Sequence, residues 1–160
     1  MASKTTIFQT PEVAKLLKAS RFTLNRIMLR CGIETSVGTR GGRGSRLLFT
    51  MEDVATLALA YWLFRSGLRM RAIRQALETT YVKRLWNHLT SVERFEEVGR
   101  SLGFLVTWRP AKGRDALQEV RLENDFAGVQ QILGSVSEYG FVVIPFGRLM
   151  KELAEAIQKY

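Results

Sequence analysis

The first apolar stripe of the chain predicts a short helix that begins at Thr10. Thr10 can cap the helix, and the Pro-Glu pair that follows suits the first turn and the positive charge of a helix N-terminus. Val13 is followed by Leu16 and Leu17, three and four positions later, which places all three side chains on one face. We expect this helix to end near residue 18 or 19.

A second helix with one apolar and one polar face is expected after a short turn. Ser20 suits its N-cap, and Gly32 suits the left-handed residue that ends a helix. At about 100° per residue, the buried face contains Leu24, Ile27, Met28 and Cys31. The opposite face presents Phe22, Asn25, Arg26 and Leu29. Two short helices joined by a tight turn, with Asn and Arg exposed on the second, are typical of a helix-turn-helix.

Residues 33–49 predict a β-hairpin with an arginine-rich tip. Apolar residues at both ends of this segment suit two short strands, and Gly41-Gly42 suits the turn between them. The guanidinium group can bind phosphate oxygens through paired hydrogen bonds. Three arginines stand in the segment, namely Arg40, Arg43 and Arg46. After a helix-turn-helix such a hairpin indicates a wing; the alternative is a mobile basic surface loop.

A third helix is expected to form the core of this half of the chain. Thr50 starts a capping-box pattern with Asp53 three residues later. Apolar residues at positions 54–64 surround most of the helix, so we expect it to be buried and Gly67 to end it. A fourth helix is expected over residues 69–77. Its predicted buried residues are Met70, Ile73 and Leu77, and its predicted exposed residues are Arg71 and Arg74.

The second half of the chain predicts a small α+β unit. Strands are expected at residues 103–108, 116–122 and 141–145, and a weak helix at residues 125–133. An amphipathic helix is expected at the C-terminal end, where Leu149, Met150, Leu153, Ala154 and Ile157 form the apolar stripe.

The predicted fold class is therefore mainly α with small β elements. A winged helix-turn-helix is expected in residues 1–77, and a small α+β domain for dimerisation or effector binding in residues 103–160. Between them, residues 78–102 predict a helical connector, which a second capping box at Thr90-Ser91-Val92-Glu93 splits.

Positive charge is concentrated in the first half. The chain has 24 Lys and Arg against 15 Asp and Glu, a net charge of +9. Residues 1–77 contain thirteen of the basic and four of the acidic residues, so 13 − 4 = +9, while residues 78–160 contain eleven of each. Phosphate binding needs a basic surface and folding does not. Duplex DNA is thus the expected partner, and an anionic membrane surface is the weaker alternative.

The sequence contains no constellation typical of an enzyme or a metal site. Cys31 and His88 are the only residues of their types, and packing is the more frequent role for each. We find no catalytic triad, phosphate loop or paired metal ligands, so we expect no catalysis and no cofactor. With no signal sequence and no membrane-spanning run, we expect a cytoplasmic, nucleoid-associated protein.

The first half resembles the DNA-binding domain of the MerR superfamily of bacterial regulators. The resemblance runs over about residues 10–77 and rests on Thr10 to Leu17, Thr23-Leu24, Arg46 and Phe49, Glu52-Asp53-Val54, Gly67-Leu68 and Ile73. It implies a homodimer with a recognition helix in each major groove and a wing against the backbone. The chain departs from the family pattern after Leu24, where Asn25-Arg26-Ile27-Met28 replaces an Arg and an aromatic-acidic cluster.

We therefore interpret the chain as a sequence-specific transcription regulator. The base-reading candidates are Arg21, Phe22, Asn25 and Arg26, with Phe22 against a thymine methyl and Asn25 on adenine. The phosphate-binding candidates are Lys15, Lys18, Arg30, Arg40, Arg43 and Arg46, and Thr23 completes the DNA-binding set. A small-molecule effector is kept open for the C-terminal half. The alternatives are an excisionase-like or packaging factor of a mobile element and a basic module that binds an acidic protein.

Overall fold

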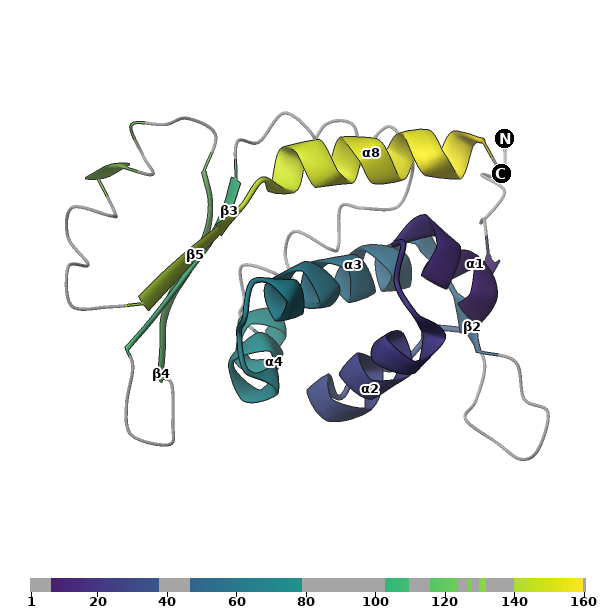
Figure 1. The fold of residues 1–160 in the computed structure, drawn as a ribbon, viewed down its shortest axis with the longest axis horizontal. Helices are drawn as coiled ribbons and strands as arrows, with labels where there is room; N and C mark the ends of the chain where they lie inside the picture. Colours follow the sequence, from purple (N-terminus) through teal and green to yellow (C-terminus); the bar gives the residue numbers. More distant parts are fainter. Residues whose placement is uncertain are drawn as a thin grey trace.

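The computed structural model describes residues 7–37, 47–78, 103–109, 116–123, 127, 130–131 and 140–159. In these residues the chain is mainly helical, with a two-stranded sheet near its start and a three-stranded sheet in its second half (Figure 1). The tip of the predicted wing, the predicted connector beyond residue 78 and most of the weak helix at 125–133 lie outside the described residues.

Helix α1 (Thr10–Leu16) has its N-cap one residue earlier than the sequence predicts. The N-cap is Gln9, whose backbone amide donates to a Glu12 carboxylate oxygen at 2.6 Å. The expectation that Thr10 caps this helix is therefore wrong, because Thr10 already has helical geometry. The acidic side chain at the third helical position takes over the capping, as it does in a capping box.

Helix α2 (Arg21–Cys31) has the predicted bounds and the predicted buried face. The Ser20 hydroxyl oxygen accepts from the Thr23 amide at 3.0 Å, and Gly32 has a left-handed φ of 68°. The buried residues are Leu24, Ile27, Met28 and Cys31. The amphipathic period of the sequence thus determines which side of α2 faces the core.

Three helices are followed by a residue with positive φ, and only two of them use glycine at this position. After α1, the amides of Ala19 and Lys18 donate to the carbonyls of Ala14 and Lys15 at 2.9 and 3.2 Å. These two bonds define a Schellman ending. Its left-handed residue is Lys18, with φ of 50°. Gly32 and Gly67 hold the corresponding positions after the next two helices.

The Lys18 and Gly67 positions predict stability changes of opposite sign. We expect Lys18→Gly to raise the free energy of unfolding by about 0.5–1 kcal/mol, because a left-handed φ is costly for residues with a Cβ. We expect Gly67→Ala to lower it by about 1 kcal/mol. A Cβ at Gly67 would meet no atom within 4 Å, so the cost there is conformational. Urea denaturation measures both, and equal effects on the two variants would contradict the assignment.

Helix α3 (Met51–Arg65) is the centre of the core, as predicted. Its N-cap is Thr50, which forms the expected capping box with Asp53. Ala55, Ala58 and Ala60 are fully buried, and these small side chains let neighbouring elements approach the helix closely. Helix α4 (Met70–Glu78) follows and buries Ile73 as predicted. Met70 and Leu77 are only half-buried, because Ala72 and Ala76 occupy the core side of α4.

The two-stranded sheet joins the start of the chain to the strand before α3. Strands β1 (Phe8–Gln9) and β2 (Leu48–Phe49) pair antiparallel, with Phe8 opposite Phe49. On its other edge Leu48 forms an antiparallel bridge with Val37. The described residues on either side of segment 38–46 are therefore close together, as the predicted hairpin requires.

The three strands predicted in the second half are confirmed. Strands β3 (Gly103–Arg109), β4 (Ala116–Glu123) and β5 (Gly140–Ile144) form an antiparallel sheet in the order β4-β3-β5. Helix α8 (Phe146–Gln158) follows after Pro145. Its predicted stripe is buried except for Leu149, which is half-buried.

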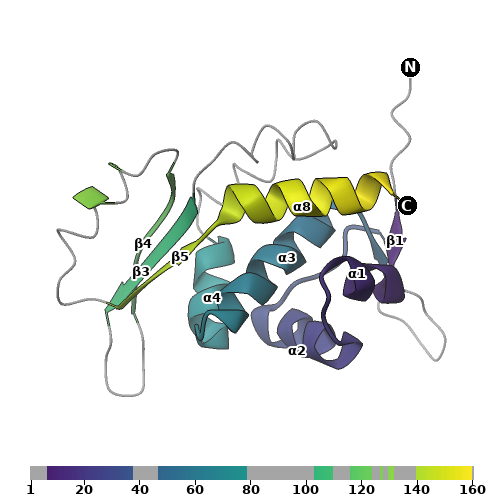
Figure 2. The same cartoon turned by 45° about the horizontal axis from the view of Figure 1, so that its top comes forward.

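Helix α8 leaves the sheet and packs on the first half of the chain (Figures 1 and 2). The Phe146 ring meets the Trp62 ring of α3 edge-on, with the centroids 6.0 Å apart. The C-terminal end of α8 reaches α1, as Figure 2 shows. One cluster of buried side chains contains residues of α1 to α4 and of α8. The hydrophobic core thus continues across the division between residues 1–77 and 103–160.

Candidate nucleic-acid interface

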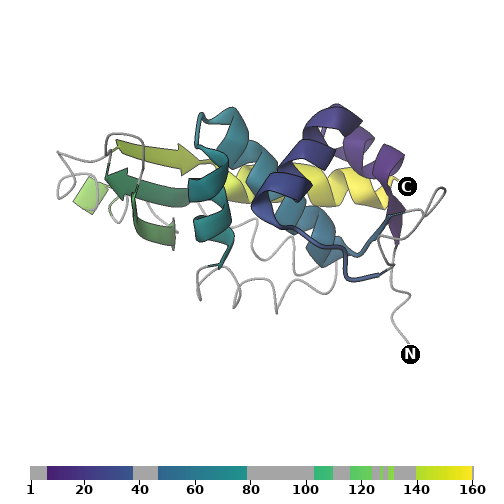
Figure 3. The same ribbon diagram turned by 90° about the horizontal axis from the view of Figure 1, so that it is seen from below.

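The side of α2 that turns away from the core carries a mixed basic and apolar surface. We call this surface the α2 face; its members are Arg21, Phe22, Asn25, Arg26, Leu29 and Arg30, all exposed. Phe22 is 78% exposed and Leu29 is 67% exposed. Helix α2 lies on the opposite side of α3 from α8 (Figures 1 and 3), so no described element covers the α2 face.

The cations of the α2 face are free to meet an external anion. Within the residues that the structure describes, Arg21, Arg26 and Arg30 form no ion pair with a carboxylate. By contrast, Arg74 and Arg148 each bind a glutamate one helical turn away, at 2.9 and 3.0 Å. An arginine held by its own helix is partly neutralised, whereas the three on α2 keep their full charge and all their donors.

Phe22, Arg26 and Leu29 follow one another along the middle of the α2 face. Their spacing of four and then three residues places them on one line along the helix. The exposed Phe22 ring lies on one side of Arg26 and the exposed Leu29 side chain on the other. Such apolar surface is unfavourable in water. Such a row fits the major groove, where arginine meets guanine and apolar groups meet the thymine methyl. Leu29 was not among the predicted site residues, although its place opposite the buried stripe indicated its exposure.

Thr23 takes part in capping α2 rather than standing on the α2 face. Its side chain is half-buried. The Thr23 and Ser20 hydroxyl oxygens are 2.8 Å apart, and the Thr23 amide donates to the same serine oxygen. These bonds fix the start of α2 and thus the direction in which Arg21 and Phe22 leave it.

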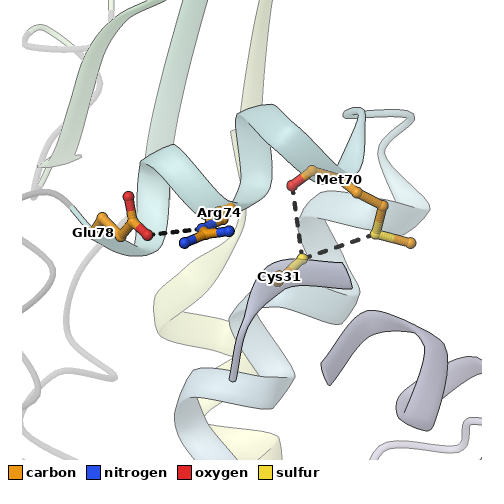
Figure 4. Close-up of polar contacts among 4 residues, drawn as sticks. All are labelled: Cys31, Met70, Arg74 and Glu78. Atoms are coloured by element: carbon orange, nitrogen blue, oxygen red, sulfur yellow. Dashed lines mark hydrogen bonds and ion pairs between the residues drawn. The ribbon is translucent and has the colours of Figure 1, made fainter. Parts of the chain in front are cut away.

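The C-terminal end of α2 is held by α4 (Figure 4). The Cys31 Sγ lies 3.7 Å from the Met70 carbonyl oxygen and 3.8 Å from the Met70 sulfur. A Cβ at Gly32 would lie 3.9 Å from the Arg74 guanidinium carbon, so that cation stands at the negative end of α2. Burial raises the pKa of the Cys31 thiol from 9.0 to about 11, and the charge of Arg74 opposes part of that rise.

The raised pKa of Cys31 predicts a loss of stability in alkali. Between pH 9 and 11 the unfolded chain ionises this thiol and the folded chain does not, so stability falls as pH rises through that window. At pH 10.5 the expected loss from this group is about 2 kcal/mol. Urea denaturation of the parent chain and of Cys31→Ala at pH 8 and 10.5 measures it, because the variant lacks this contribution. An equal pH dependence in both proteins would disprove the assignment.

Asp53 anchors the segment that leads into the predicted wing. Its carboxylate is buried and accepts from the Ser36 amide at 3.0 Å, the Ser36 hydroxyl at 2.6 Å and the Thr50 amide at 2.8 Å. Ser36 and Thr50 stand on opposite sides of segment 38–46, so one carboxylate fixes the chain before and after it. The capping box indicated the bond to Thr50, but no feature of the sequence indicated the bonds to Ser36.

The structure brings some of the predicted DNA-binding residues together and separates others. Lys15 and Lys18 belong to α1 and its C-terminal turn, and Lys18, which is exposed, lines a groove together with residues of α8. Arg40, Arg43 and Arg46 lie outside the described residues, so their role stays a prediction. The remaining arginines, Arg21, Arg26 and Arg30, share α2 with Phe22 and Asn25.

Comparison with models of known protein families gives no match, and comparison with curated protein sequences gives none. In the described part of the chain, no helix combines the length and the apolar character that crossing a bilayer requires.

Proposed function

We propose that this chain is a sequence-specific DNA-binding transcription regulator that places the α2 face in the major groove. The observation that carries the proposal is the exposed row formed by Phe22, Arg26 and Leu29, in which Arg26, like its neighbours Arg21 and Arg30, has no ion pair among the described residues. The large exposed apolar side chains of Phe22 and Leu29 are unfavourable in water unless a partner covers them. The flanking arginines make that partner an anion.

The packing of α2 supports the same function. A short turn joins α1 to α2, and Ser20 and Gly32 fix the two ends of α2. Its opposite side is buried against α3 and α4. A rigid helix with fixed ends can present side chains to base edges in a constant register. The net charge of +9 in residues 1–77 supplies the long-range attraction to a phosphate backbone.

The homodimer is part of the proposal and comes from the resemblance to the MerR superfamily. Two copies of α2 would occupy successive major grooves about 34–36 Å apart, and the binding site would then have two-fold symmetry. Selection of binding sites from a library of random duplexes tests this symmetry. Locating the selected sites in a genome separates a promoter regulator from a recombination or packaging factor.

Replacing Arg26 tests the interface at its centre. On a selected site we expect Arg26→Ala to weaken binding by about 1–3 kcal/mol, or 5–150-fold, and to relax discrimination at one position of each half-site. Arg148→Ala is the matched control, since it removes the same charge from α8 on the other side of α3. Fluorescence anisotropy with labelled duplexes measures both. Equal affinities of Arg26→Ala and Arg148→Ala for every sequence would refute the proposal.

A further inference from the structure

A groove of about 600 Å³ lies between α8 and the C-terminal ends of α1 and α3. We call it the α8 groove. Its volume falls within the range of about 300–1,000 Å³ that small-molecule sites occupy. Three helices line it, and two of them belong to the first half of the chain. A molecule bound there would therefore contact both halves.

The floor of the α8 groove is apolar and partly aromatic. Leu17 lines it from the end of α1, Trp62 from α3 and Leu153 from α8. Tyr61 adds a second aromatic side chain from α3. This floor suits a ligand with a ring or a hydrocarbon body, because burying apolar surface is the main source of affinity in such sites.

The rim of the α8 groove carries an excess of positive charge. Four cationic side chains line it, from Lys18, Arg65, Arg148 and Lys159, against the two carboxylates of Glu152 and Glu155. Arg148 is paired with Glu152 at 3.0 Å. Lys18 and Lys159 form no ion pair with any described residue, while the Arg65 guanidinium stands over the Tyr61 ring at 6.0 Å from its centroid. Three unneutralised cations thus face one free carboxylate.

The backbone of Lys18 gives a second indication. Lys18 is the only non-glycine residue with positive φ in the described part of the chain, at a position where Gly32 and Gly67 serve the other helix ends. A lysine there costs stability relative to glycine. Residues held in such a conformation cluster at functional sites, and this lysine is exposed and lines the α8 groove.

We propose that the α8 groove binds an amphipathic organic anion, a carboxylate or sulfonate with an aromatic or aliphatic body. The anionic group would lie between Lys18 and Lys159, and the body would cover Trp62 and Leu153. Lys18 stands two residues before Ser20, the cap of α2. A ligand in the α8 groove would therefore contact the turn that sets the direction of the α2 face. That last consequence rests on the proposed function; the binding itself does not.

Titration with anilinonaphthalene sulfonate, an aromatic sulfonate whose fluorescence rises in apolar sites, tests the proposal without DNA. We expect saturable binding of one molecule per folded chain. The double variant Lys18→Glu/Lys159→Glu should bind it at least about tenfold more weakly, because both contacts with the sulfonate become repulsive. The double variant Arg71→Glu/Lys151→Glu carries the same charge change on exposed residues outside the groove, and should bind it with less than a twofold change.

A variant that keeps the charge separates groove binding from general attraction. Ala156 lines the groove and is half-buried, so Ala156→Trp should fill the groove and abolish binding without altering the rim. Circular dichroism melting checks that each variant is folded. Equal binding by the two double variants, or full binding by folded Ala156→Trp, would overturn the proposal. Either result would leave the DNA-binding proposal intact, since no DNA takes part in the experiment.

Discussion

Affinity for duplex DNA should fall by about 10³–10⁵-fold when salt rises from 50 to 200 mM. This is the largest effect that we expect, and it follows from where the charge lies. All of the net charge of +9 is in residues 1–77, and Arg21, Arg26 and Arg30 have no carboxylate partner among the described residues. A dimer that neutralises on the order of 6–10 phosphates releases as many counterions, and added salt opposes that release.

The slope of affinity against salt also identifies the residues responsible. In a plot of log affinity against log salt concentration, replacing Arg30 by alanine should reduce the slope by about 1, which corresponds to the loss of one phosphate contact. Arg148→Ala should leave it unchanged, since that guanidinium is paired with Glu152 on α8. Anisotropy titrations at four or more salt concentrations give the slopes. A slope that corresponds to one phosphate or fewer would show that the basic surface serves another partner, such as an acidic protein.

Phe146→Ala should lower the free energy of unfolding by about 3–5 kcal/mol. The Phe146 side chain is fully buried, at the first position of α8, and its ring meets Trp62 of α3 edge-on. Truncation to alanine removes this contact and leaves a cavity between α8 and α3, and the surrounding helices can fill it only in part. Because the core continues from α3 into α8, we expect the whole described fold to lose stability in one transition.

Val143→Ala is the control for this prediction. Val143 lies three residues earlier on β5 and is 37% exposed, so its truncation should cost less than about 1 kcal/mol. Thermal melting followed by circular dichroism and by tryptophan fluorescence measures both variants. Phe146→Ala would contradict this account if it melted in two separate transitions and its first half melted at the temperature of the parent chain. That result would show that α8 is not part of the core of the first half.

The elements that sequence patterns predict well are those whose own periodicity determines their burial. The four apolar residues of α2 repeat at helical spacing, and Ser20 and Gly32 mark its ends, so its bounds and both faces follow from the sequence alone. The capping box at Thr50 likewise fixes the start of α3. The three strands predicted in the second half are also confirmed, as is the buried stripe of α8 apart from the half-buried Leu149.

The features that the sequence did not reveal depend on contacts between distant residues. Strand β1 has two residues, too few for a periodic signal, and exists because Phe8 pairs with Phe49. The bonds between Asp53 and Ser36 span seventeen positions. Lys18 is a predicted phosphate-binding residue because of its charge, and only the packing of α8 on α1 shows that it also lines a groove. Likewise, no local pattern indicates that α8 completes the core of the first half.

Methylation interference at guanine N7 tests most directly whether the α2 face enters the major groove, because N7 lies on that side of the base pair. We predict that methylation of a guanine in each half of the selected site blocks binding of the parent chain. We also predict that Arg26→Ala loses this sensitivity at one guanine per half-site. Interference confined to adenine N3 in the minor groove, or the same guanine pattern for the parent chain and Arg26→Ala, would contradict the account.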